Sequence, residues 1–165
     1  MSTTVIIYYS KTGFSQRYAL WLAEELNCQA LPYRDRKALN LSRYDTIILL
    51  GGLYAGNMSG LSWLKKQPLA GKRAAAVAVG CSPMGWPGQK ESMEKLFSGT
   101  SIQGFYCQGG LAYDRMGAVD RAMMAALRTA LRRKPEMADM LAGISQSFDG
   151  AKREYLAPVA AWAKQ

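Results

Sequence analysis

Apolar residues occur along this chain in short continuous runs, and they do not alternate regularly with polar residues. Continuous runs of this length are typical of β-strands that helices cover on both faces. The runs are Val5 to Tyr9, Cys28 to Leu31, Thr46 to Leu50, Ala74 to Val79 and Gly104 to Cys107, of which the second is the weakest. We therefore predict five strands within a single domain that spans residues 1–165.

Helical spacing of apolar residues appears between the predicted strands. The helical segments include residues 18–26, a short helix with Leu61 and Leu64 that ends near Gln67 and Pro68, and residues 93–97 and 151–164. Pro158 predicts a kink or a late start for the last one. Alternating strands and helices with short loops predict an α/β fold with a doubly wound parallel sheet of order 2-1-3-4-5. In that order the loops after the first, third and fourth strands meet at the edge of the sheet where ligands bind.

The segment 109–143 does not fit a minimal five-stranded plan. It predicts an extra amphipathic helix after the fifth strand, because apolar and basic residues fall on opposite helical faces. One face carries Met116, Asp120, Met123, Met124, Leu127 and Leu131, and the other carries Arg121, Arg128 and Arg132. Such a helix either docks its apolar face on its own domain or serves as an interfacial, partner-binding helix.

The first predicted loop, residues 10–15, has the composition of an anion site. Ser10, Thr12 and Ser15 supply hydroxyls, Gly13 permits a tight turn, and the following helix presents free N–H groups. A terminal phosphate fits such a loop without a paired cation, because donors converge from the backbone and the hydroxyls. The loop matches neither GxxxxGK[ST] nor GxGxxG. The alternative is a plain strand-to-helix turn with a Ser or Thr N-cap and no ligand.

Two further glycine-rich loops carry large aromatic residues, Tyr54 in "GGLYAGNMSG" and Trp86 in "GCSPMGWPG". A planar ligand stacked between these rings, with its phosphate in the first loop, would use all three loops. The alternative is that both rings merely cover the end of the sheet. Together with the absence of histidine, the three loops predict a site for flavin mononucleotide (FMN).

Composition narrows the chemistry further. The chain has no histidine, which excludes a Ser-His-Asp triad and the usual imidazole ligands of zinc, so a redox cofactor is the natural source of reactivity. The three cysteines lack CxxC spacing and predict neither disulfides nor a metal site.

The net charge of +9 favours an anionic membrane surface or an acidic redox protein as partner. Nucleic acid is disfavoured because no binding motif is present. We expect a cytoplasmic protein, with peripheral contact to the inner face of the membrane as a further option.

These motifs, taken in order, resemble the flavodoxin family, and within it the branch that contains menaquinone-dependent protoporphyrinogen oxidases. The likeness covers nearly the whole chain. Its elements are the phosphate motif Ser10-Lys11-Thr12-Gly13-Phe14-Ser15, the second loop Leu53-Tyr54-Ala55-Gly56-Asn57, the third loop opening Gly80-Cys81-Ser82, and the run from Gly109 that includes Tyr113 and Asp120-Arg121.

The resemblance implies a noncovalent FMN whose ring rests against the second and third loops. It also implies a peptide beside the flavin that rearranges on reduction, and Gly56-Asn57 has residue types that tolerate positive φ. Carrier flavodoxins are acidic, whereas this chain is basic, so we expect a less negative potential. The third loop is shorter than in the oxidase branch, which weighs against a porphyrin substrate.

We therefore expect an FMN-dependent oxidoreductase that passes electrons from a reduced donor to an acceptor such as a quinone. The alternatives are an electron carrier without a substrate of its own and a binding module that has lost the cofactor. No side chain is assigned as catalytic: Tyr113 and Asp114 are candidates for proton transfer or simple turn residues. Cys81 is interpreted as a small packing residue whose backbone faces the ring.

Overall fold

The computed structural model describes residues 3–165 and contains a parallel sheet of five strands with order β2-β1-β3-β5-β6. The strands are β1 (Thr4–Tyr9), β2 (Gln29–Pro32), β3 (Thr46–Tyr54), β5 (Arg73–Gly80) and β6 (Gln103–Gln108). Counted along the chain, these parallel strands have the predicted order 2-1-3-4-5, so the fold class is confirmed. A short strand β4 (Asn57–Met58) adds an antiparallel pair to the end of β3.

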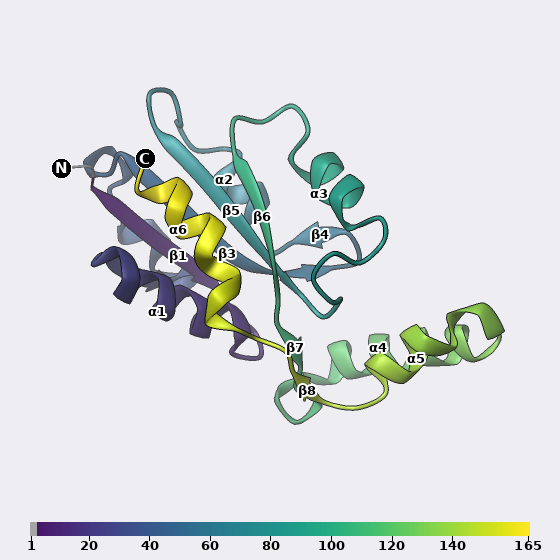
Figure 1. Ribbon diagram of the computed structural model, residues 1–165. Coiled ribbons are helices and arrows are strands. Elements are labelled where there is room, and N and C mark those ends of the chain that lie inside the picture. The colour runs from purple at the N-terminus through teal and green to yellow at the C-terminus, as the bar shows by residue number, and fades with distance from the viewer. Residues whose placement is uncertain (1–2) are drawn as a thin grey trace.

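Helices cover both faces of the sheet, which is why its strands are apolar on both sides (Figure 1). The helices α1 (Phe14–Leu26) and α6 (Ala157–Ala163) lie on one face, and α2 (Leu61–Leu64) and α3 (Gln89–Phe97) lie on the other. Side chains of β3 alternate between the two cores, with Ile48 on the α1 side and Leu49 on the α2 side. Both are completely buried.

Short 3₁₀ turns complete the main body of the fold. They are η1 (Tyr33–Ala38), η2 (Leu41–Arg43) and η5 (Arg153–Leu156). The last of these precedes α6, so the helix begins at Ala157 with Pro158 in its first turn. Of the two possibilities that Pro158 allowed, the late start is the correct one, because proline fits the first helical turn.

An insertion, which we define as residues 110–149, leaves and re-enters the domain at the carboxyl end of β6. The antiparallel strands β7 (Gly110–Leu111) and β8 (Phe148–Asp149) form its base. It contains η3 (Tyr113–Arg115), α4 (Ala118–Arg132), η4 (Pro135–Met137) and α5 (Ala138–Ile144). Figure 1 shows that this helical hairpin extends away from the sheet, at the opposite end from the two chain termini.

The insertion confirms the predicted extra helix and adds one that was not predicted. Helix α4 ends at Arg132, and Pro135 starts the turn that leads into α5. A small core of Leu111, Leu131 and Ile144 holds the hairpin to its base.

Only part of the predicted apolar face of α4 docks on the insertion. Met124 and Leu131 pack in its small core, whereas Met123 and Leu127 remain 50% and 38% exposed. Val119 lies one turn before Met123 and is 73% exposed. The face therefore divides into a docked half and an exposed apolar stripe, Val119-Met123-Leu127.

The junction between the sheet and the insertion is anchored by Tyr18 of α1, which is completely buried. Its hydroxyl donates a hydrogen bond to the carbonyl of Gln108 at the end of β6 and accepts one from the Lys152 amide at 3.1 Å. Because burial raises the pKa of Tyr18, its phenol remains a donor at all physiological pH values. One side chain thus ties α1 to both ends of the inserted segment.

Candidate functional site

The loop between β1 and α1 leaves the first amides of a 13-residue helix without side-chain partners. Gly13 adopts φ 99° at the N-cap, and no acidic side chain lies in the first turn. Ser10 Oγ accepts a hydrogen bond of 3.0 Å from the Gly13 amide, which tightens the loop. Free N–H groups at the positive end of a helix bind phosphate well. The geometry therefore fits the predicted anion site.

The six residues of this loop contribute in different ways. Phe14 is buried in the core under α1, so only its backbone faces the loop. Ser15 is 4% exposed, and its hydroxyl makes no hydrogen bond with any residue of 3–165. Lys11 and Thr12 lie on the loop surface, where Thr12 adds a second hydroxyl.

Three cations surround the loop of residues 10–15, which we call the phosphate loop after its predicted ligand, and two of them are paired with carboxylates. Lys11 Nζ lies 3.6 Å from Asp120 of α4, and Arg17 Nη1 lies 2.6 Å from Asp149 of β8. Arg115 of η3 donates from Nη1 to the Thr12 carbonyl at 3.1 Å. The insertion thus contacts the loop through Asp120 and Arg115. The sequence interpretation did not include Arg115, because a residue 103 positions away gives no local signal.

The second predicted loop is a tight β-hairpin. Leu53 and Tyr54 belong to β3, Asn57 belongs to β4, and Tyr54 pairs with Asn57. The turn consists of Ala55 at φ 45° and Gly56 at φ 79°. A two-residue turn of this kind needs positive φ at both central residues. Of the pair Gly56-Asn57, whose residue types tolerate positive φ, only Gly56 adopts it. Ala55 takes the other turn position, at a cost of about 1–2 kcal/mol.

Tyr54 is held where the first two loops and α4 meet. Lys11 Nζ lies 4.7 Å from the centre of its ring. Burial and the adjacent Asp120 carboxylate raise the pKa of Tyr54, so its hydroxyl stays protonated at neutral pH. The structure thus gathers Lys11, Tyr54 and Asp120, of which Asp120 entered the sequence analysis only as a helix-face residue and through the resemblance.

The third loop starts where β5 ends, and its path depends on Tyr106 of β6. The ring of Tyr106 lies across Gly80, where a Cβ atom would come within 2.8 Å of the tyrosine hydroxyl. That hydroxyl donates to the Ser82 carbonyl at 2.7 Å. Glycine is therefore required at position 80, and Tyr106 is a shaping residue that sequence reasoning missed. The strand register pairs Gly80 with Gln108, and Tyr106 lies two residues before Gln108. Tyr106 therefore lies on the same face of the sheet as the partner of Gly80, which only the register reveals.

Cys81 behaves as a packing residue in this loop. Burial raises the pKa of its thiol, so the thiol is protonated and weakly nucleophilic at neutral pH. Burial also raises the pKa of the Cys107 thiol, to about 12, so this thiol is protonated at neutral pH as well.

A cavity of about 500 Å³ lies between the third loop and α5. Cys81, Ser82 and Trp86 line one side, and Met140, Ile144 and Phe148 of the insertion line the other. Trp86 is 43% exposed and lies between two glycines with positive φ, Gly85 and Gly88. The insertion therefore completes a mostly apolar cavity beside the third loop.

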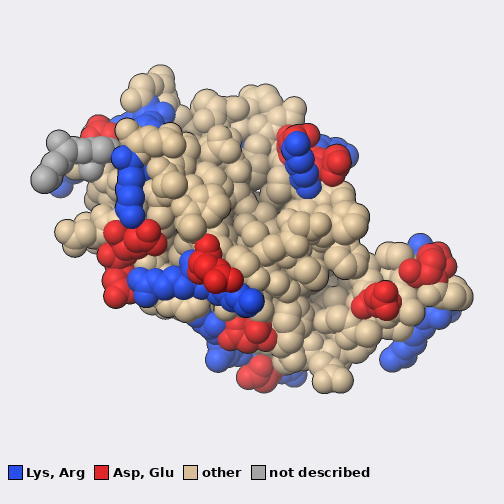
Figure 2. All heavy atoms as spheres, viewed as in Figure 1, with Lys and Arg blue, Asp and Glu red and all other residues tan. Residues whose placement is uncertain are grey.

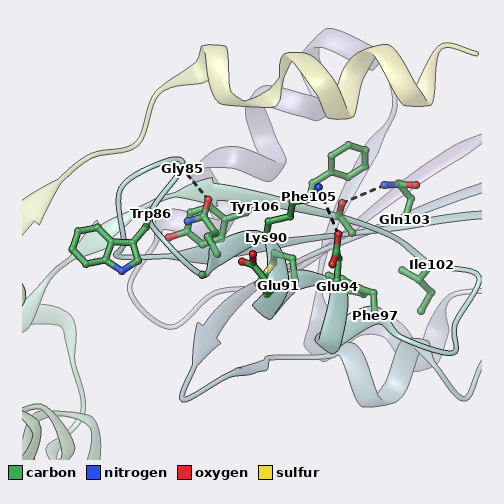
Figure 3. A pocket seen from close by; sticks show the side chains of 14 residues that line it. Gly85, Trp86, Lys90, Glu91, Glu94, Phe97, Ile102, Gln103, Phe105 and Tyr106 are labelled. Carbon is green, nitrogen blue, oxygen red and sulfur yellow. Dashed lines mark hydrogen bonds and ion pairs between the residues drawn. The ribbon is translucent and has the colours of Figure 1, made fainter.

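A second cavity, of about 590 Å³, lies between α3 and β6 (Figure 3). Trp86 stands at one end of it and Phe97 and Ile102 stand at the other (Figure 3). No residue of the first two loops lines either cavity. The candidate site is therefore the group of three loops at the carboxyl edge, and the cavity beside the insertion adjoins it through Cys81 and Ser82 of the third loop.

The predicted aromatic walls keep separate contacts in the structure. Tyr54 contacts Lys11, whereas Trp86 lines the two cavities, and no ring contact joins them within residues 3–165. They are therefore free to contact a ligand from different loops.

Within residues 3–165 no group of three or more Cys, Asp or Glu side chains is placed to hold a metal ion. No helix between residues 3 and 165 is long and apolar enough to cross a membrane.

The family model for the flavodoxin domain matches residues 5–138. The chain belongs to the flavodoxin-domain family. The match includes the phosphate loop, both other loops and helix α4 of the insertion.

Solved structures agree with this fold. A protein from Bacteroides uniformis ATCC 8492, classed as a candidate flavoprotein, is 15% identical over 99% of both chains with a TM-score of 0.53. A flavodoxin, WrbA-like protein from Agrobacterium tumefaciens is 18% identical over 100% of this chain and 99% of its own, with a TM-score of 0.50. No curated protein matches the chain.

Proposed function

We propose that this flavodoxin-domain protein binds FMN noncovalently and transfers electrons between a reduced donor and an acceptor. The observation that carries the proposal is the uncapped N-terminus of α1, which opens at the sheet edge where two aromatic-bearing loops also end. Family membership supports the same cofactor.

In this proposal the phosphate binds to the amides at the start of α1 and to the hydroxyls of Ser10, Thr12 and Ser15. The flat ring lies against the Tyr54 hairpin and the third loop, where Gly80-Cys81-Ser82 offers backbone and Trp86 offers an aromatic face. Bound FMN supplies the redox chemistry, because it accepts and releases electrons singly or in pairs. The protein's part is to bind the phosphate, orient the ring and set the local charge.

The charge of the site favours a less negative potential than in acidic carriers. Arg115 lies against Thr12 without an ion pair, whereas Asp120 offsets the charge of Lys11 beside Tyr54, so the positive group near the proposed phosphate is Arg115. Positive surroundings stabilise the reduced, negatively charged cofactor relative to the oxidised form.

A quinone is the proposed acceptor, with an electron carrier lacking a substrate of its own as the second candidate. The resemblance to the quinone-dependent oxidase branch suggests the acceptor. The 500 Å³ cavity supports it, since Met140, Ile144 and Phe148 offer apolar contacts to a flat ring beside the third loop. An acidic redox protein as donor is consistent with the net charge of +9.

The insertion also supports peripheral contact with an anionic membrane, where quinones are found. The exposed stripe Val119-Met123-Leu127 runs along α4, and Arg132, Arg133 and Lys134 follow at its end. Figure 2 shows Lys and Arg gathered along one edge of the outer end of the hairpin. An apolar stripe beside basic residues is the pattern of an interfacial helix.

Visible spectroscopy of the purified protein tests the cofactor proposal. We expect a yellow protein that releases FMN on denaturation, or a colourless one that takes up added FMN in a 1:1 ratio. The flavin should then be reduced chemically and mixed with a menaquinone analogue. Saturable reoxidation supports a quinone acceptor, whereas reoxidation at the rate of free FMN favours the carrier.

Vesicle sedimentation tests the membrane contact. We expect binding to vesicles that contain anionic lipid and weaker binding by a Met123→Ser, Arg132→Gln, Arg133→Gln variant. A variant with Lys90→Gln and Lys95→Gln on α3 controls for the loss of positive charge. Equal binding of all three proteins, or no binding to anionic vesicles, would contradict this part of the proposal.

A further inference from the structure

Arg115 stands out among the cations at the phosphate loop because it is not paired with a carboxylate within residues 3–165. Lys11 is paired with Asp120 and Arg17 with Asp149, but Arg115 forms no ion pair with any residue of 3–165. Its one side-chain hydrogen bond goes from Nη1 to the neutral carbonyl of Thr12. An arginine has five N–H donors in a planar fork, so most of its hydrogen-bonding capacity remains open.

The guanidinium lies directly against the turn that starts α1. Its Nη1 is 3.1 Å from the Thr12 carbonyl oxygen and 3.0 Å from the position that a Cβ atom would take on Gly13. Gly13 is the N-cap of α1, so an unneutralised cation adjoins the free amides of the first helical turn. Both groups attract the same kind of ligand, an anion of phosphate size.

The backbone that carries Arg115 is fixed by contacts within the insertion. The Arg115 amide donates to the Ala112 carbonyl at 3.0 Å, and the Tyr113 amide donates to Ser147 Oγ at 3.0 Å. The Tyr113 hydroxyl also donates to the Ile144 carbonyl, and the Arg128 guanidinium lies 5.0 Å from the centre of its ring. The guanidinium therefore reaches the loop from an anchored base.

The charge of Arg115 extends into the surrounding site. Burial raises the pKa of Asp149, but hydrogen bonds from Arg17 and Ala151 and the charges of Arg17 and Arg115 outweigh that effect and lower it. Asp149 is already paired with Arg17 at 2.6 Å, so it does not satisfy Arg115.

From this geometry we infer that Arg115 is a phosphate-binding residue that makes the site selective for FMN over unphosphorylated riboflavin. The inference rests on the proposed function and deepens it. A guanidinium binds phosphate through charge-assisted and often bidentate hydrogen bonds, so the contact contributes affinity only when the phosphate is present. The insertion thereby takes part in cofactor choice, although it lies about a hundred residues from the phosphate loop.

The test compares the dissociation constants of FMN and riboflavin for the unaltered chain and for Arg115→Gln. We expect the substitution to weaken FMN binding by about 10-fold to 100-fold, the range of a hydrogen bond to a charged group, and to leave riboflavin binding unchanged. Arg115→Lys keeps the charge without the fork and should lie between the two. Arg43→Gln removes an exposed charge in η2, before the start of β3 and outside the three loops, and serves as the matched control.

Each outcome separates the inference from the proposed function. FMN binding by Arg115→Gln that equals the unaltered chain would overturn the inference and leave the proposed function standing. Equal weakening of FMN and riboflavin would also overturn it, because Arg115 would then only hold the loop in shape. If the unaltered chain binds neither flavin, the proposed function fails and the inference fails with it. Far-ultraviolet circular dichroism and thermal unfolding without flavin check that the variants fold.

Discussion

The sheet and the insertion, which extends away from the carboxyl ends of the strands (Figure 1), are stabilised differently. The sheet strands β1, β3 and β5 are almost completely buried between two helical layers. The insertion has a small core around Leu131 and Ile144, and α4 leaves a stripe of apolar side chains in solvent. Its firm contacts are instead polar ones, made at its base and to the phosphate loop. The difference indicates that the buried sheet supplies the stability, whereas the insertion is the region in which surface substitutions test the proposed roles in affinity and partner choice.

The largest expected difference is in the response to truncation of apolar side chains. Ile48→Ala removes a completely buried side chain of β3 and should lower the free energy of unfolding by about 2–5 kcal/mol. Met123→Ala on the exposed stripe should change it by less than about 0.5 kcal/mol. Urea unfolding of the flavin-free protein measures both. Similar losses in the two variants would show that the insertion contributes to the core as much as the sheet does.

A substitution at Tyr18, where the sheet meets the insertion, is expected to lower the free energy of unfolding by an intermediate amount. Tyr18→Phe leaves the Gln108 carbonyl and the Lys152 amide without their buried partner and should cost about 1–3 kcal/mol. Tyr8→Phe is the control, because the Tyr8 hydroxyl makes no hydrogen bond within residues 3–165. Hydrogen exchange should also show faster exchange in β7 and β8. Unchanged exchange there would indicate that Tyr18 does not couple the insertion to α1.

The phosphate loop permits a matched pair of glycine substitutions. Gly13 and Gly71 both have positive φ, so alanine at either position should cost about 1–2 kcal/mol of stability. Only Gly13→Ala places a Cβ atom 3.0 Å from Arg115 and within the proposed phosphate site, whereas a Cβ atom on Gly71 meets nothing within 4 Å. Isothermal titration should therefore show weaker FMN binding for Gly13→Ala and unchanged binding for Gly71→Ala. Equal affinities would argue against phosphate binding at this loop.

The smallest expected effect is a pH dependence at the base of the insertion. The pKa of Asp149 is lowered in the folded protein from its ordinary value of 3.8. The ionised carboxylate therefore stabilises the folded state above pH 3.8, and this contribution is lost as the pH falls through the lower pKa of the folded state. The Asp149 side chain is 53% exposed, and solvent screening limits the effect to less than about 1 kcal/mol. Asp149→Asn should flatten stability between about pH 4 and pH 2 relative to Asp114→Asn. Parallel curves for the two variants would exclude a contribution from the Arg17 pair.

The sequence predicted the sheet better than the insertion for a physical reason. Strands covered on both faces are continuously apolar, so β1, β3 and β5 were visible directly. The double glycine at 51 and 52 was interpreted as the start of a loop, and the structure instead continues β3 to Tyr54. Pro135 was the available signal for a break between α4 and α5, and it was not used.

The site shows the same division between local and long-range information. The anion-binding character of residues 10–15 follows from neighbouring residues, and the structure has the geometry that such a site needs. Arg115 and Tyr106 act on loops that are distant in the sequence, Arg115 on Thr12 and Tyr106 on Ser82. No pattern in one sequence reports such contacts, because they depend on the register of the sheet and the path of the insertion.

Titration of the purified, flavin-free chain with FMN, followed by flavin fluorescence, tests whether the three loops bind a phosphorylated flavin. We expect saturable 1:1 quenching, with riboflavin bound more weakly because it lacks the phosphate that the α1 amides would receive. Equal affinity for the two flavins would contradict the phosphate site, and the absence of saturable quenching would contradict flavin binding altogether.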